Sequence, residues 1–144
     1  MLTYSRYKDI KGRSFVTIMI IIALSSLLLR ITVERIIKIN IEQNESNAQV
    51  TLKLVSAALE NYSKANQGVF PASLSFLTKT NPAYLDKDYI ASSPIKGYNY
   101  VCSRIDPAGY NCSASPVKCN ITGKMAYTIT TGGLLVSEGC SRRE

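Results

Sequence analysis

The run FVTIMIIIALSSLLL at residues 15–29 decides how this chain is built. From Ser14 to Leu29 there is no charged residue, no glycine and no proline, and Arg30 ends the run. As a helix, residues 14–29 would cover about 24 Å, slightly less than the ~30 Å hydrocarbon core of a bilayer. Arg30 can extend its guanidinium to the interface, so this deficit is small. Because backbone groups in lipid must be satisfied within their own segment, we predict a transmembrane helix over residues 14–30.

The residues in front of this run set its expected orientation. Residues 1–13 are short and basic, with lysine or arginine at positions 6, 8, 11 and 13. Positive flanks of a transmembrane helix stay in the cytoplasm. We therefore predict a cytoplasmic leader over residues 1–13 and place everything after Arg30 on the other side of the membrane. Two other interpretations stay open: a cleaved secretory signal, although no A-x-A-like site follows the run, and a buried core helix.

Composition limits the chemistry that the chain can perform. It contains no histidine, which is the commonest general base and metal ligand, and its net charge of +7 is spread along the chain. Asp86 and Asp88 flank a lysine and are interpreted as a solvated loop rather than as paired catalytic carboxylates. We therefore expect no enzyme, no cofactor and no metal site. Without a run of lysine and arginine, nucleic acid is not the expected partner.

The cysteines all lie in the last third of the chain, at positions 102, 112, 119 and 140. Their spacing lacks the paired C-x₂₋₄-C of a zinc site, and they fall on the side predicted to face an oxidising compartment. Two disulfides are therefore expected. Cys102 and Cys112 lie opposite each other if the segment between them is a hairpin that turns at residues 106–109, which favours Cys102–Cys112 with Cys119–Cys140.

The predicted helix does not have to stop at the membrane, because no glycine or proline occurs between Gly12 and Gly68. Residues 31–67 are therefore an expected extracytoplasmic continuation of the helix. Its first part stays rich in isoleucine at positions 36, 37, 39 and 41, which need either lipid or copies of the chain around them. Further on, a stripe predicts the buried face, at Val50, Leu54, Ala58 and Tyr62 with Val55 and Leu59 beside them. The opposite face is expected to hold Lys53, Ser56, Glu60 and Ser63.

Residues 68–144 are predicted to form a loop region and an antiparallel sheet. Ser73 is the expected N-cap of a short helix, Leu74–Lys79, and a second apolar cluster is expected at Tyr84, Leu85, Tyr89 and Ile90. Two hairpins follow, with strands at 98–105, 110–117, 124–131 and 134–138, and with Gly132-Gly133 as a two-residue turn. The expected fold is α+β, with a long N-terminal helix packed on a small four-stranded antiparallel sheet.

The middle of the chain carries short motifs that resemble a known family. They are LVSAALENY at 54–62, NQGVFP at 66–71, Ser73-Leu74, and SPIKGYNY at 93–100. Together with the basic leader and the apolar helix, they resemble type IV pilin-like proteins, and most closely the major pseudopilins of type II secretion. The resemblance covers most of the chain as an architecture, and residues 15–100 as residue motifs.

This resemblance implies a structural subunit of a type IV pilus or type II secretion pseudopilus in the bacterial inner membrane. Its expected partners are copies of itself, other pilin-like subunits, membrane lipid, a prepilin peptidase and the inner-membrane assembly machinery. Filament packing is then expected at Phe15, Ile18, Ile22, Ile36 and Ile37. Two alternatives stay open: a signal-anchored extracytoplasmic binding module that never polymerises, and a competence-type pilin that captures DNA.

Leader cleavage, which the family performs between a glycine and a phenylalanine, falls here on Gly12, Arg13, Ser14 and Phe15. Cleavage after Gly12 would leave Arg13 first and Thr17 fifth, and cleavage after Ser14 would leave Phe15 first and Met19 fifth. Neither register gives the glutamate that the family has at its fifth position. The acidic calcium-binding loop of many major pseudopilins has no counterpart in this chain either.

Overall fold

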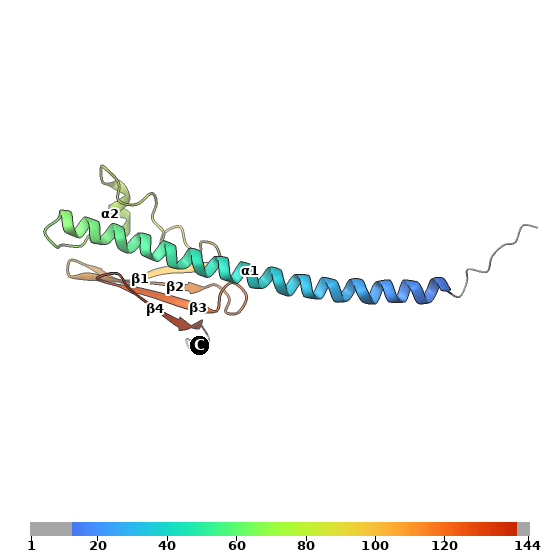
Figure 1. Ribbon diagram of the computed structural model, residues 1–144. Helices are drawn as coiled ribbons and strands as arrows, with labels where there is room; N and C mark the ends of the chain where they lie inside the picture. Colours follow the sequence, from blue (N-terminus) through green and yellow to red (C-terminus); the bar gives the residue numbers. More distant parts are fainter. Residues whose placement is uncertain (1–12, 141–144) are drawn as a thin grey trace, which may run out of the picture. The chain divides into compact units, whose positions relative to one another are not determined.

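A computed structural model describes residues 13–140 of the chain (Figure 1). Its elements are helices α1 (Arg13–Ala65) and α2 (Leu74–Lys79), followed by strands β1 (Tyr98–Asp106), β2 (Gly109–Pro116), β3 (Met125–Thr130) and β4 (Leu134–Gly139). The α+β prediction is therefore confirmed. Gly12 and the rest of the predicted leader before Arg13 lie outside the described residues. The chain divides into two compact units, Met1–Ile37 and Lys38–Glu144, and each is described by itself.

The long helix α1 ends at Ala65, and the chain then adopts a left-handed backbone conformation at residues 67 and 68. Gln67 and Gly68 have φ angles of 58° and 87°, and the Gly68 amide turns back to donate to the Ser63 carbonyl at 2.8 Å. The Asn66 side chain donates to the Tyr62 carbonyl at 2.8 Å. These bonds satisfy carbonyls that the end of a helix leaves without partners. The helix therefore ends at Ala65, two residues before the predicted end of the continuation at residue 67.

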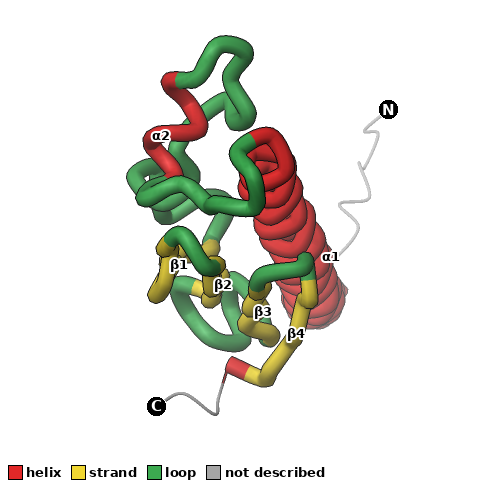
Figure 2. Tube along the Cα trace, turned by 90° about the vertical axis from the view of Figure 1, so that its left-hand side faces the viewer, coloured by secondary structure: helices red, strands yellow, loops and turns green. Residues whose placement is uncertain are grey.

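The four strands form one antiparallel sheet in the order β1-β2-β3-β4, with each strand beside its neighbour in sequence. Figure 2 shows them side by side, with α1 on one side of the sheet. Cys102 pairs directly with Cys112 across β1 and β2, and the register shifts just after Cys102.

The connection between β3 and β4 differs from the prediction. Because Thr130 pairs with Leu134, the loop has three residues, Thr131–Gly133, and not the two-residue turn expected from Gly132-Gly133. Both glycines have positive φ, at 86° and 77°, which explains why this position requires them. The Gly133 amide closes the loop by donating to the Thr130 carbonyl at 2.9 Å.

The face of α1 that packs on the sheet is rotated from the predicted stripe. Its buried residues are Ala48, Leu52, Val55, Ser56, Ala58, Leu59 and Ser63. Val50 is 62% exposed and Leu54 is 44% exposed, so the prediction was wrong for both. It was also wrong for Ser56 and Ser63, which were placed on the outer face. The physical reason at Ser56 is a hydrogen bond of 2.7 Å between its hydroxyl and that of Tyr110, which lets a polar residue face the sheet.

Residues 68–97 complete the core. Leu74 and Leu77 of α2 are buried. In the predicted apolar cluster, Leu85 and Tyr89 are buried, with Tyr84 and Ile90 partly buried against the core. Ser73 stands at the N-cap position of α2, but its side chain makes no capping bond and instead contacts the Ser75 hydroxyl at 2.9 Å. Ser73 is therefore the N-cap residue, as predicted, but its side chain does not make the predicted capping hydrogen bond.

Candidate functional site

The candidate functional site is the apolar surface of the first part of α1. This helix is long and apolar enough to cross a membrane by length and composition, and its most apolar window has no residue buried within the chain. The residues predicted for filament packing are all exposed: Phe15, Ile18, Ile22, Ile36 and Ile37. At the candidate processing site, Ser14 and Phe15 are exposed residues of the helix, and Arg13 is its first residue.

The apolar surface of α1 is longer than one bilayer. A hydrocarbon core of ~30 Å takes about 20 helical residues, which from Ser14 reach Val33. Ile36, Ile37 and Ile39 follow this point and are 42–52% exposed. Ile41 was expected to need lipid or neighbouring copies, and this was wrong, because it is buried within residues 38–140.

A charged band separates the two apolar stretches. The Arg30 guanidinium lies 3.4 Å from the Glu34 carboxylate, and both side chains are exposed. An ion pair four residues apart on an exposed helix surface is worth a few tenths of a kcal/mol. This pair therefore adds little to the stability of α1.

Two glutamates of α1 hold the sheet by accepting backbone hydrogen bonds. Glu60 accepts from the Gly132 amide at 2.7 Å and from the Tyr110 hydroxyl at 3.0 Å. Glu45 accepts from the Lys124 amide at 2.7 Å. Burial raises the pKa of Tyr110, so this phenol stays a neutral donor. The sequence placed Glu60 on the solvent face and missed both contacts.

Replacing Glu60 with alanine is expected to destabilise the head by about 1.5–3 kcal/mol, because hydrogen bonds to a charged acceptor are worth about that much. Glu60→Gln keeps one acceptor oxygen and should cost less. Guanidinium unfolding of the full chain in detergent, followed by the near-ultraviolet circular dichroism of its tyrosines, would measure both. Equal stability of the alanine variant and the parent chain would contradict the role of Glu60.

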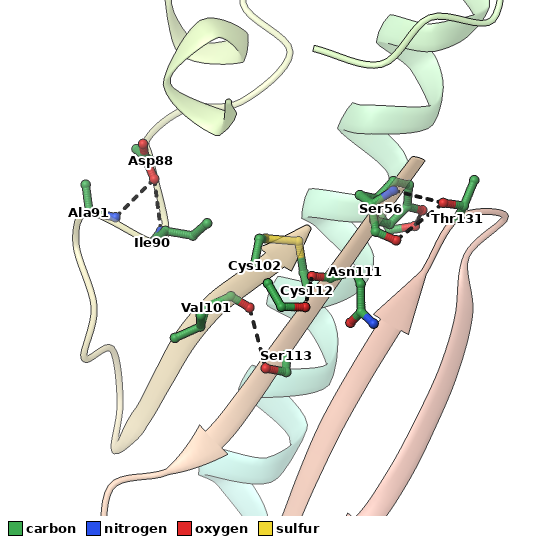
Figure 3. The surroundings of a disulfide bond; sticks show 12 residues. Ser56, Asp88, Ile90, Ala91, Val101, Cys102, Asn111, Cys112, Ser113 and Thr131 are labelled. Carbon is green, nitrogen blue, oxygen red and sulfur yellow. Dashed lines mark hydrogen bonds between the residues drawn. A yellow bond between two sulfur atoms is a disulfide. The ribbon is translucent and has the colours of Figure 1, made fainter. Parts of the chain in front are cut away.

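The four cysteines form two disulfides, and their predicted pairing is confirmed. Cys102–Cys112 joins β1 to β2, as Figure 3 shows, and Cys119–Cys140 joins the loop after β2 to the residue after β4. Beside the first disulfide lies an apolar cavity of about 10 Å³, lined by residues that include Leu52, Val55 and Tyr89. A space of this size is about that of one water probe, which is too small for a ligand.

Removing Cys119–Cys140 by a double alanine substitution is expected to cost about 3 kcal/mol, since this disulfide closes a chain segment with a sequence separation of 21 residues. The same change at Cys102 and Cys112, whose separation is 10 residues, should cost less in the chain-entropy account. Denaturant unfolding of the full-length variants would compare them. A larger loss at Cys102–Cys112 would contradict this order.

The aspartates of the described chain, Asp86, Asp88 and Asp106, make structural contacts. Asp88 accepts from the amides of Ile90 and Ala91 and so shapes the loop, as Figure 3 shows, and Asp86 accepts from the Tyr89 hydroxyl at 2.9 Å. On the sheet, the hydrogen bond from the Arg104 guanidinium lowers the pKa of Asp106. Within residues 13–140, no group of three or more histidine, cysteine, aspartate or glutamate side chains is arranged to hold a metal ion.

Comparisons with protein-family models, with curated proteins and with solved structures find no match for this chain. The function must therefore be argued from the residues and the fold.

Proposed function

We propose that this chain is a non-enzymatic subunit of a pilus or pseudopilus filament in the bacterial inner membrane, with its N-terminus in the cytoplasm and its head outside. The first part of α1 is the membrane anchor and the assembly element. The sheet domain forms the outer surface of the filament. The partners are copies of this chain and other pilin-like subunits, together with a prepilin peptidase and the assembly machinery.

The observation that carries this proposal is the exposed apolar surface beyond the bilayer. A simple anchor needs apolar residues only over the hydrocarbon core, and the charged band at Arg30 and Glu34 would then begin the water-facing part. Ile36, Ile37 and Ile39 instead resume an apolar surface beyond it. Isoleucines that stay exposed beyond a membrane span support an interaction site there. Helices of neighbouring copies, held parallel by the same membrane, have the right chemistry to cover it.

Photocrosslinking in the native membrane tests this proposal. A benzophenone side chain is placed at Ile36 in the full chain, and the matched control carries it at Val101, an exposed residue of β1. Filament packing predicts a ladder of crosslinked dimers and higher multimers from position 36. Crosslinks to lipid alone from position 36 would overturn the proposal and favour the anchored binding module that does not polymerise.

The processing of the N-terminus is a further expected outcome. If a prepilin peptidase acts on this chain, the mature protein recovered from its membrane should begin at Arg13 or at Phe15. N-terminal sequencing and intact mass would distinguish the two registers. An intact Met1 leader would favour the anchored module, which also agrees with the absence of glutamate at the fifth position in either register. A start beyond Leu29 would make the chain a secreted domain and would overturn the filament.

A further inference from the structure

Strand β4 forms one edge of the sheet, and no strand of residues 13–140 pairs with its outer side. Figure 2 shows it as the outermost strand, next to β3. All of its residues except Leu135 are exposed, and Leu134 and Val136 have exposed fractions of 65% and 46%. Natural sheet edges are commonly protected by lysine, proline or a bulge. Strand β4 has none of these, because its register against β3 is continuous and Glu138 is its only charged residue.

The opposite edge of the sheet, at β1, is covered by residues of the chain itself. The Ile95 amide donates to the Tyr98 carbonyl at 2.9 Å, and the Tyr98 amide donates back to the Ile95 carbonyl at 3.0 Å. The Tyr100 amide donates to the Ser93 hydroxyl at 2.8 Å. Further along β1, the register shifts just after Cys102, and such a bulge interrupts regular pairing. The head therefore protects β1 and leaves β4 open.

The open edge presents a defined set of backbone groups. The Cys140 amide donates to the Lys124 carbonyl at 2.9 Å, which shows that the backbone of Cys140 is directed to the β3 side. In an antiparallel pair, residues that bond to the neighbouring strand alternate with residues that do not. Counting back in steps of two, the even-numbered residues of β4 bond to β3. The amides and carbonyls directed outward are those of Leu135, Ser137 and Gly139.

Both ends of β4 are held in place although most of its side chains are exposed. Before the strand, the Gly132 amide donates to the Glu60 carboxylate at 2.7 Å. After the strand, Cys140 forms a disulfide with Cys119. Within the strand, Leu135 packs partly against the core. These contacts keep the outward groups in line without a covering element, and such pre-organisation lowers the entropy cost of binding a partner.

The side chains of β4 define what a partner strand has to carry. Leu134, Val136 and Glu138 alternate along the strand, so their side chains project from one face of the sheet. Apolar pairs and pairs of opposite charge stabilise neighbouring strands. A complementary strand therefore has branched apolar residues beside Leu134 and Val136, and a lysine or arginine beside Glu138.

From these observations we propose that β4 binds an extended segment of another polypeptide, which joins the sheet as an additional strand. Main-chain hydrogen bonds to the outward groups of Leu135, Ser137 and Gly139 hold the segment. Its alternating apolar side chains and its cation beside Glu138 select it among other extended segments. This inference concerns the head alone, goes beyond the proposed filament function and does not depend on it.

Residue-by-residue amide hydrogen exchange of the full chain in a non-ionic detergent tests this proposal. The probe is a soluble acetylated peptide that contains Lys-Thr-Val-Thr-Val, the antiparallel complement of residues 134–138. Strand addition predicts that exchange slows about tenfold or more at the outward amides of Leu135 and Ser137, because each gains a hydrogen bond. The matched control peptide carries N-methyl groups on both threonines, whose amides would face β4, and it should give no protection. Equal exchange with and without the probe overturns the proposal, and so does equal protection by the control peptide.

Two variants make this result specific. Ser137→Pro removes one outward amide and leaves the bonds to β3, so the protection at Leu135 should be lost while the head unfolds as in the parent chain. Glu138→Lys leaves the backbone unchanged and keeps the test valid if the proline variant is unstable. It should lower the affinity for the probe about twofold to fivefold, and a probe with glutamate in place of lysine should restore it. Protection that rises with chain concentration in the absence of any peptide would overturn the proposal and assign β4 to a contact between copies.

Discussion

Replacing Leu52 with alanine is expected to destabilise the head by about 2–5 kcal/mol, whereas the same change at Leu54 should cost less than about 1 kcal/mol. Leu52 is 1% exposed in the core between α1 and the sheet, and Leu54 is 44% exposed. Truncation at Leu52 removes buried methyl groups and leaves a cavity beside Val55 and the Cys102–Cys112 disulfide, where the packing already has a small void. Denaturant unfolding of the full chain in detergent would measure both variants.

The two substitutions form a matched pair. They remove the same atoms from the same helix two residues apart, so the change in helix propensity is the same for both. Their difference in unfolding free energy therefore reports burial. Equal losses at the two positions would show that α1 does not present the 48-52-55-59 face to the sheet.

This pair also locates the main error of the sequence prediction. Val50 and Leu54 have the same hydrophobic character as Leu52 and Val55, so a periodic pattern could not decide which of two neighbouring stripes faces the sheet. The deciding contacts are polar and long-range. The Ser56 hydroxyl meets Tyr110, which is 54 residues away, and Glu60 meets Gly132, which is 72 residues away. Neither contact can be predicted from the local sequence, because each joins residues that lie far apart in the chain.

Other features could be predicted because a local rule fixes them. The absence of glycine and proline between Gly12 and Gly68 determined the length of α1, and the hairpin register placed Cys102 opposite Cys112. The candidate site was predictable for the same reason, since it is a run of apolar residues on a helix. The backbone anchoring by Glu45 and the place of the 117–124 loop depend on tertiary packing, so the sequence alone did not reveal them.

Placing a glutamate at Ile36 is expected to reduce assembly by about a hundredfold or more, because an unpaired charge buried between packed helices costs about 3 kcal/mol or more and each 1.4 kcal/mol is a factor of ten. Ile36 is 52% exposed in the single chain and lies beyond the charged band at Arg30 and Glu34. Insertion into the membrane should therefore be unaffected, and the head should unfold as in the parent chain. The measurement is the amount of filament, or of crosslinked multimers, recovered from native membranes.

Two variants make this result specific. Ile36→Leu keeps the apolar character and should assemble, and Val101→Glu adds the same charge to an equally exposed residue of the head's sheet and should assemble as well. Normal assembly of Ile36→Glu would mean that the isoleucines after the charged band are not covered by neighbouring copies. The apolar surface of α1 would then serve the membrane alone, and a non-polymerising anchored module would explain the chain better than a filament subunit.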